Sequence, residues 1–341
     1  MNKILLATIL LSLVLIAGYA GNQTPVSAER DDTNQFMVGI FRADGAVIPF
    51  AQYGNGGWWN PWPRPRDIAE SIYAEGTEVV HHSLTDLPEP WFKQCGKTPT
   101  TWFFSPSDGT ATLVRATKVF QVSAHSGSNW ALLTDFPRQS SEDPLHDILG
   151  VAVNVNQKIE PAIEINTAST EANEISSFVK QIFTGIETEE IDRMRAETPP
   201  AITNLPLMFS LSKEERAKIE VSLTRLYRSN SVVNGEHIYY FEAEKYYQRP
   251  TTSRNPGCDD ISALQGWISA DAKGGIGLME NLLVFTDCDR KGPSTMIPLG
   301  MMRLKDRTFL FVIEHGWEDA SYTILELDTS GLHRVLETVG G

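Results

Sequence analysis

The stretch Cys258–Cys288, CDDISALQGWISADAKGGIGLMENLLVFTDC, carries the pattern that decides the fold. Two runs rich in apolar residues, Ile261–Asp271 and Gly275–Phe285, are separated by the three residues Ala272–Gly274. A three-residue loop that ends in glycine is a common hairpin connection, because glycine takes the left-handed backbone conformation that the turn needs. The stretch therefore predicts two long antiparallel strands.

The same hairpin predicts a disulfide. If Asp271 faces Gly275, the register carried to the open end brings Cys258 opposite Cys288. Facing Cα atoms of antiparallel strands lie about 4.5 to 5.5 Å apart, a distance that suits a disulfide. The chain has 3 cysteines, so this pairing leaves Cys95 unpaired, in a role that the sequence does not define.

The predicted register also pairs Trp267 with Met279 and Ile261 with Phe285. A single β-bulge would shift this register by one residue. Two unrelated cysteines, or a metal held by the aspartates beside them, are the alternatives to a disulfide.

Runs of the same kind continue on both sides of the hairpin. Short loops separate them, and a parallel βαβ unit would need a helix in each connection, so the pattern predicts antiparallel sheets. In the N-terminal part, two Asp-Gly turns lie between pairs of such runs, at Asp44-Gly45 and Asp108-Gly109. The other C-terminal runs are His237–Tyr247, Ile297–Leu304, Thr308–His315, Ser321–Leu327 and Leu332–Glu337.

One segment has helical periodicity. Between Glu171 and Ile186, apolar residues recur with the i, i+3, i+4, i+7 spacing of one helix face. A second short helix is expected from Thr188 to Glu197, before Pro199-Pro200 ends it.

The expected fold is therefore mainly β, with two antiparallel β-rich halves joined by a short helical insert. We expect an N-terminal β-rich domain at residues 34–165, the insert at 166–205 and a C-terminal β-meander domain at 206–341. The alternative is a single domain like a β-propeller, closed by both termini. It rests on FRADGAVIPF (41–50) and ELDTSGLHRVLE (326–337), which both have a strand, a turn with Asp and a second strand.

Residues 1–28 read as a signal peptide and the first residues of the mature chain. Lys3 precedes an apolar run, Ile4–Ala17, which is short for a bilayer span of about 20 residues but suits a signal peptide. Small residues allow cleavage after Ala20 or Ala28, and an uncleaved anchor is the alternative. We expect a periplasmic or extracellular protein with no membrane insertion after cleavage.

Charge and missing motifs narrow the functional classes. The formal net charge is −14, which disfavours nucleic acid because an acidic surface repels phosphates. The sequence has no Walker loop, no Gly-x-Ser-x-Gly, no His-Glu-x-x-His and no Cys-x-x-Cys motif. We therefore expect neither a cofactor nor a metal, although a site assembled from distant residues would leave no local motif.

A segment rich in tryptophan, Gly54–Arg66, is the first candidate binding site. It holds Trp58, Trp59, Trp62 and Arg64 between glycines and prolines. Aromatic faces fixed by a stiff backbone suit a glycan or an extended, proline-rich peptide. The alternative is a structural plug at one end of a β domain, because Trp is usually at least partly buried.

A pair of carboxylates is the second candidate. Glu242 and Glu244 lie two residues apart in the run YYFEAEKYY, so strand alternation places both on one face, beside Tyr240 and Tyr246. Carboxylates about 6 to 7 Å apart are near the spacing that glycosidases use. Any strand with one solvated face has the same pattern.

Three functions follow from these observations. The first is a noncatalytic exported protein that binds a ligand or interacts with the cell envelope, possible ligands being a glycan or an extended peptide. The second is a secreted hydrolase of glycans that uses Glu242 and Glu244. The third is a structural protein without a small ligand. Exposed Trp side chains would indicate a binder, and a cavity shared by Glu242 and Glu244 would indicate an enzyme.

Overall fold

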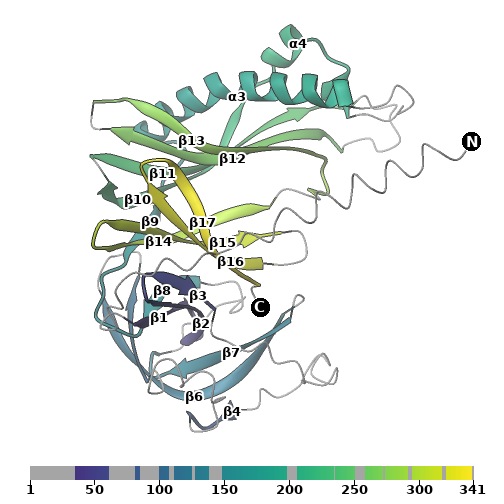
Figure 1. Cartoon of the computed structure of the whole chain (residues 1–341). Helices are drawn as coiled ribbons and strands as arrows, with labels where there is room; N and C mark the ends of the chain where they lie inside the picture. Colours follow the sequence, from purple (N-terminus) through teal and green to yellow (C-terminus); the bar gives the residue numbers. More distant parts are fainter. Residues whose placement is uncertain are drawn as a thin grey trace, which may run out of the picture.

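Strand pairing divides the chain into two antiparallel sheets, which Figure 1 shows in the computed structural model. The chain is mainly β, as expected, with two halves that resemble barrels. Residues 1–28, which are predicted to hold a signal peptide, and Trp62, Arg64 and Cys95 lie outside the described residues. The structure describes residues 35–60, 81–84, 100–106, 111–124, 127–137, 148–197, 206–233, 235–249, 258–271, 273–290, 294–316 and 320–339.

The first half is a closed ring of strands. The order is β1-β8-β5-β6-β7-β2, and β1 pairs with β2 to close it. The short strands β3 and β4 extend from β2 and β6. The strands are β1 (Phe36–Arg42), β2 (Ala46–Gly54), β3 (Gly57–Trp59), β4 (His81–His82), β5 (Thr101–Ser105), β6 (Thr112–Ala124), β7 (Gly127–Thr134) and β8 (Ile148–Val153).

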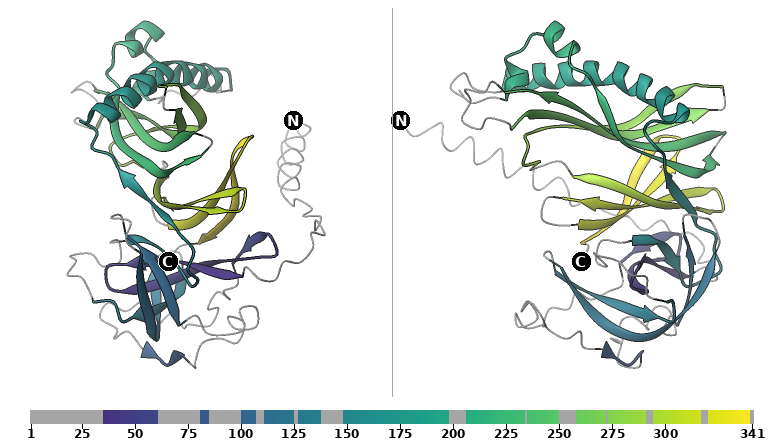
Figure 2. Two further views of the ribbon diagram at one scale, coloured as in Figure 1. Left: turned by 90° about the vertical axis from the view of Figure 1, so that its left-hand side faces the viewer. Right: turned by 180° about the vertical axis from the view of Figure 1, so that it is seen from behind.

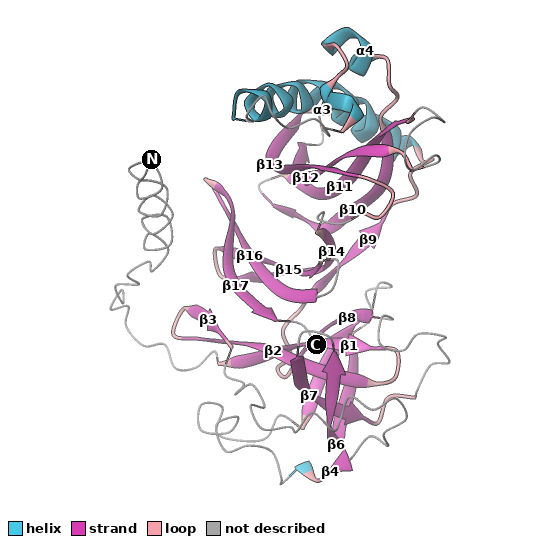
Figure 3. Ribbon diagram, turned by 90° about the vertical axis from the view of Figure 1, so that its right-hand side faces the viewer, coloured by secondary structure: helices cyan, strands magenta, loops and turns pink. Residues whose placement is uncertain are grey.

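The second half is one curled sheet of nine strands with β9 at its centre (Figure 3). One arm runs from β10 to β13 and the other from β14 to β17. The strands are β9 (Glu160–Glu164), β10 (Ser222–Val233), β11 (Glu236–Tyr247), β12 (Asp260–Asp271), β13 (Ile276–Thr286), β14 (Thr295–Leu304), β15 (Arg307–His315), β16 (Ala320–Asp328) and β17 (Gly331–Val339). Side chains of both arms meet in one apolar cluster, so the arms enclose an inner face.

The domain boundaries differ from the expected ones at β9. This strand falls within residues 34–165, yet it pairs with β10 and β14 of the second sheet. Its partners follow it in the chain by many residues, and neither composition nor spacing indicates which sheet it joins.

The helical segment is a packed part of the second half and not only a connection between the halves. A single helix, α3 (Thr170–Glu197), replaces the two expected helices and packs on the outer face of β10–β13 (Figures 1 and 2). The helix continues beyond Ile186 because Glu187 and Ile191 extend its buried stripe. A 3-10 turn (Leu207–Phe209) and a short helix, α4 (Lys213–Ala217), lead back to the sheet. Among the described helices, none has the length and apolar character to cross a bilayer.

The two halves share one apolar core. Val38 and Ile40 of β1 belong to the same apolar cluster as Phe309 and Phe311 of β15, and the Phe50 ring of β2 lies 5.3 Å from that of Tyr322 in β16. Met37 and Phe41 lie on the opposite face of β1 and belong to the apolar cluster inside the ring of the first half. The propeller alternative is not what the structure shows, because β1 closes its own ring while β17 pairs, among the described strands, with β16 alone.

An ion pair inside the second half fixes α3 to β11. The Lys245 Nζ atom donates to Glu187 Oε2 at 2.8 Å, and both side chains are fully buried. The Tyr247 hydroxyl donates to Glu187 Oε1 at 2.5 Å, and Lys245 lies over the Phe183 ring. Buried charges are tolerated only with such partners, so the pair fixes which face of β11 the helix covers.

We predict that Glu187→Gln lowers the free energy of unfolding by about 3 to 5 kcal/mol, because Lys245 would stay buried without its counter-charge. The double variant Glu187→Leu/Lys245→Met should regain most of this loss. Urea denaturation followed by circular dichroism measures both. As a control, Arg193→Gln removes an exposed helix ion pair with Glu197 and should leave the midpoint unchanged. Equal midpoints for Glu187→Gln and the wild type would contradict this role of the pair.

Candidate functional site

The candidate site lies on the inner face of β11. Tyr239, Phe241 and Ala243 belong to the cluster beneath α3. Tyr240 belongs to the inner cluster between the arms of the sheet, so Glu242 and Glu244 follow on that same inner face. The burial of the odd-numbered residues beneath the helix therefore decides where the two carboxylates point.

Both carboxylates line one depression. It is small, with a volume of about 40 Å³. Strands β11, β12 and β13 form it together with the turn after β13 and the start of β14. Its lining side chains include Glu242, Glu244, Ala263, Gln265, Val284, Thr286, Arg290 and Thr295.

Glu244 is held in a two-pronged ion pair. The guanidinium of Arg290 donates to both of its carboxylate oxygens, at 2.5 Å and 3.0 Å. The Tyr246 hydroxyl donates to Glu244 and accepts from Arg290 at 3.0 Å. The Glu244 side chain is 8% exposed and that of Arg290 54% exposed, so the pair reaches from the strand into solvent.

Glu242 has a different environment. Its Oε1 atom accepts a hydrogen bond from the Tyr240 hydroxyl at 3.1 Å, and the Arg225 guanidinium lies 3.8 Å away. Burial raises the pKa of the Glu242 carboxyl, and Glu244 adds to this rise, whereas Arg225 and Tyr240 oppose it. Burial therefore favours the neutral form of Glu242, whereas Glu244 is oriented by its hydrogen bonds with Arg290 and Tyr246.

Gln265 and Arg290 are among the members of this site that were not identified from the sequence. Gln265 faces Glu242 across the β11–β12 pair, and its Oε1 lies 2.9 Å from the Tyr240 hydroxyl. The β11–β12 pairing could have indicated Gln265, because it is the cross-strand partner of a candidate residue. Arg290 has no such signal, because it lies in a turn beyond the end of β13.

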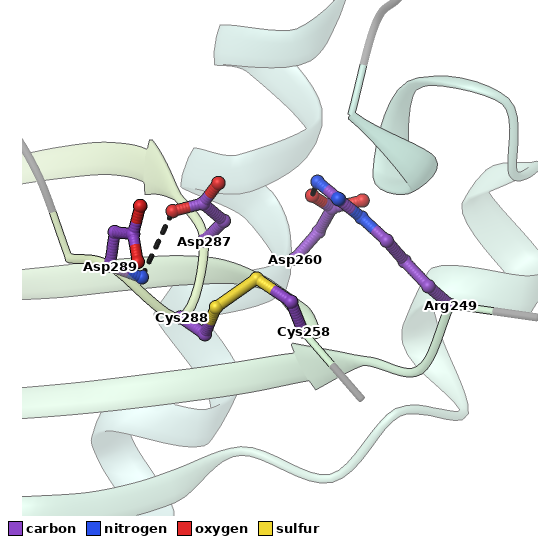
Figure 4. Close-up of a disulfide and its surroundings, with 6 residues drawn as sticks. All are labelled: Arg249, Cys258, Asp260, Asp287, Cys288 and Asp289. Carbon is purple, nitrogen blue, oxygen red and sulfur yellow. Dashed lines mark hydrogen bonds and ion pairs between the residues drawn. A yellow bond between two sulfur atoms is a disulfide. The ribbon is translucent and has the colours of Figure 1, made fainter. Parts of the chain in front are cut away.

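The disulfide fixes the turn that carries Arg290. Cys258 and Cys288 lie at disulfide distance, as the hairpin spacing predicts, with Cα atoms 5.2 Å apart (Figure 4). Closing a loop of 30 residues stabilises the fold by about 3 to 4 kcal/mol in the chain-entropy model. Arg290 follows two residues later, and its amide donates to the Asp287 carbonyl at 2.9 Å.

The facing pairs predicted inside the hairpin are wrong by one residue. The register agrees with the prediction as far as Ile268 and Leu278, and then a bulge places Trp267 opposite Glu280. Beyond the bulge Ile261 lies opposite Thr286 instead of Phe285. The disulfide still forms because both cysteines lie outside the strands, where the backbone accommodates the shift.

Of the tryptophan segment, the structure describes Trp58 and Trp59, and both are partly buried. Trp58 packs edge-on against Phe36, Phe309 and Phe311 in the core shared by the halves, which is the structural role considered above. Trp59 is half-buried and covers Gly54, where an added Cβ would lie 2.7 Å from the indole ring. Trp62 and Arg64 lie outside the described residues.

No protein-family model, curated protein or solved structure matches this chain. The functional argument therefore depends on the chemistry of the site.

We predict that the free energy of unfolding of Glu242→Gln increases relative to that of the wild type as the pH rises from about 4 to 7. The raised pKa means that the folded state binds this proton more tightly than the unfolded chain, whose Glu pKa is about 4.3. The contribution of Glu242 to the stability of the wild type is therefore fully present at low pH, and it is lost as the pH rises through the pKa that this carboxyl has in the folded state. The Gln side chain of the variant does not titrate, so the variant has no such loss. Urea midpoints measured across this range test the difference.

The control is Glu280→Gln, which removes an exposed carboxylate of β13. If the urea midpoints of the wild type and Glu242→Gln differed by the same amount at all pH values, the raised pKa of Glu242 would be contradicted.

Proposed function

We propose that the chain is an exported, noncatalytic binding protein and that a short glycan binds across the surface around the small depression at Glu242, Glu244 and Arg290. The observation that carries this proposal is the cluster of Glu244, Arg290 and Tyr246 at the rim of an open depression. Carboxylate oxygens accept hydrogen bonds from sugar hydroxyls, and a guanidinium donates to them.

The rigidity of the cluster supports binding. The Glu244 side chain is already oriented by Arg290 and Tyr246, and the disulfide holds the turn beside them. Groups that are fixed before the ligand arrives lose little conformational entropy on binding. Tyr246, which is 39% exposed, adds an aromatic face on which a sugar ring can pack.

This proposal moves the binding site away from the tryptophan segment. Trp58 is partly buried and packs edge-on against the shared core, which suits a structural role better than a platform for a glycan or an extended peptide. The ligand class considered from the sequence is kept, and its location changes to the inner face of β11.

Hydrolysis of a glycan is the second candidate function. It is favoured by one observation: Glu242 and Glu244 share a depression, and burial favours the neutral form of Glu242, as an acid catalyst requires. Binding is preferred because both Glu244 oxygens already accept hydrogen bonds from Arg290, which suits an anchor better than a nucleophile.

Calorimetric titration with maltotetraose, cellotetraose and chitotetraose tests the proposal. We predict that at least one of these sugars binds and that Arg290→Met weakens its affinity about 10- to 100-fold, since a hydrogen bond to a charged group contributes about 1.5 to 3 kcal/mol. Arg303→Met, which changes an exposed arginine of β14, is the matched control and should bind like the wild type.

Three results would count against this function. The first is that none of the three sugars binds to folded wild-type protein, and the second is that both arginine variants bind equally well. The third is release of new reducing ends from a bound sugar. If Glu242→Gln abolished that release without loss of binding, hydrolysis would replace binding as the proposed function.

Export and the disulfide are tested together. We expect that expression with the native leader gives a mature chain that begins near Gly21 or Glu29, and that peptide mapping without reductant recovers Cys258 joined to Cys288. Mass spectrometry of the purified protein measures both. A retained leader would contradict export, and Cys95 joined to either partner would contradict the pairing.

A further inference from the structure

The Tyr240 hydroxyl lies within hydrogen-bond distance of two acceptor oxygens, but it has only one hydrogen to donate. It accepts a hydrogen bond from the Met296 amide at 2.9 Å. It also lies 3.1 Å from Glu242 Oε1 and 2.9 Å from Gln265 Oε1, which are both acceptors when the carboxyl is ionised. A hydroxyl has a single hydrogen, so it donates to only one of these two oxygens at a time.

Burial makes this shortage costly. Tyr240 is 1% exposed and Gln265 is 7% exposed, so water does not readily replace a missing partner. The Gln265 Nε2 atom is buried and has no hydrogen-bond partner among the described residues. An unpaired buried polar group costs about 1 to 3 kcal/mol, so an arrangement that satisfies more of these atoms is favoured.

One arrangement requires a neutral Glu242. The protonated carboxyl donates to the Tyr240 oxygen, and the hydroxyl donates to Gln265 Oε1. Tyr240 is then fully satisfied, with two hydrogen bonds accepted and one donated. Gln265 Nε2, a donor, is directed away from Tyr240.

The other arrangement requires an ionised Glu242. The Tyr240 hydroxyl then donates to Glu242 Oε1, and the Gln265 amide turns over so that Nε2 donates to the Tyr240 oxygen. Tyr240 is again satisfied, but Gln265 Oε1, an acceptor, is now directed away from it. The two ends of an amide have nearly the same shape, so the turn needs no repacking.

We infer that Glu242 and Gln265 are coupled through Tyr240, and that the proton on Glu242 decides whether Gln265 offers a donor or an acceptor to the depression. Gln265 is therefore a residue that determines specificity. This inference rests on the proposed function for its ligand, because Gln265 lines the same depression as Glu242 and Glu244. The coupling itself does not require a ligand.

The charged and titratable groups around Glu242 come from two strands and the turn after β13. Arg225 and Tyr227 lie on β10, Glu244 lies on β11, and Arg290 follows β13. The two arginines favour the ionised carboxyl, whereas burial and Glu244 favour the neutral one. Burial has the largest effect on the pKa of Glu242 and raises it. The exchange between the two arrangements therefore occurs at a higher pH than the titration of an ordinary glutamate.

Nuclear magnetic resonance of the full chain tests the coupling without a ligand. With Glu242 labelled at its carboxyl carbon and Gln265 at its amide nitrogen, we expect both signals to shift with pH at one common midpoint. In Glu242→Gln the Gln265 signal should lose its pH response and remain at its low-pH position. Glu280→Gln should leave both titrations unchanged.

A second variant tests the coupling independently, in case Glu242→Gln does not fold. Gln265→Met removes the competing acceptor, so the Tyr240 hydroxyl is always available to an ionised Glu242. The Glu242 midpoint should then shift to lower pH. A Gln265 signal that stays constant while Glu242 titrates, or one that still titrates in Glu242→Gln, would overturn the coupling.

A binding measurement completes the test. The affinity for a sugar that binds should change across the Glu242 midpoint in the wild type and stay constant in Glu242→Gln. If the signals are coupled but no sugar binds, the proposed function fails and the coupling stands. If a sugar binds with equal affinity on both sides of the midpoint, the role of Gln265 in specificity fails.

Discussion

The structure depends on strands that are apolar on both faces. In β15, Phe309, Phe311 and Ile313 point toward the first half, and Leu310 and Val312 point toward the inner face of the second half. Strands β1 and β2 are buried on both faces in the same way, between the interior of the ring and β15. Apolar burial is the main favourable term in folding, so this double burial joins the two halves through one continuous core.

The candidate site follows from the same constraint applied to β11. One face of this strand is committed to α3 by its apolar residues and by the Glu187–Lys245 pair. The alternate residues are thereby directed to the inner face, where Arg290 and Tyr246 hold Glu244 and Tyr240 joins Glu242 to Gln265. A site built on paired strands and braced by a disulfide is held more rigidly than one built on a loop.

Local patterns in the sequence predicted the features that depend on neighbours in the chain. The hairpin of β12 and β13, the shared face of Glu242 and Glu244 and the proximity of the two cysteines follow from period-2 alternation and turn residues. The membership of β9, the bulge at Met279, and the contributions of Gln265 and Arg290 depend on contacts between distant segments, which leave no periodic signal. The packing of Trp58 against the shared core has the same cause, because its partners Phe309 and Phe311 lie in the other half.

Differential scanning calorimetry of the full chain tests most directly whether the two halves share one core. A shared core makes them unfold as one cooperative unit, so a single transition is expected, with a calorimetric enthalpy equal to the van't Hoff enthalpy. Two separate transitions, or a calorimetric enthalpy well above the van't Hoff value, would show that the halves unfold independently and would contradict the shared core.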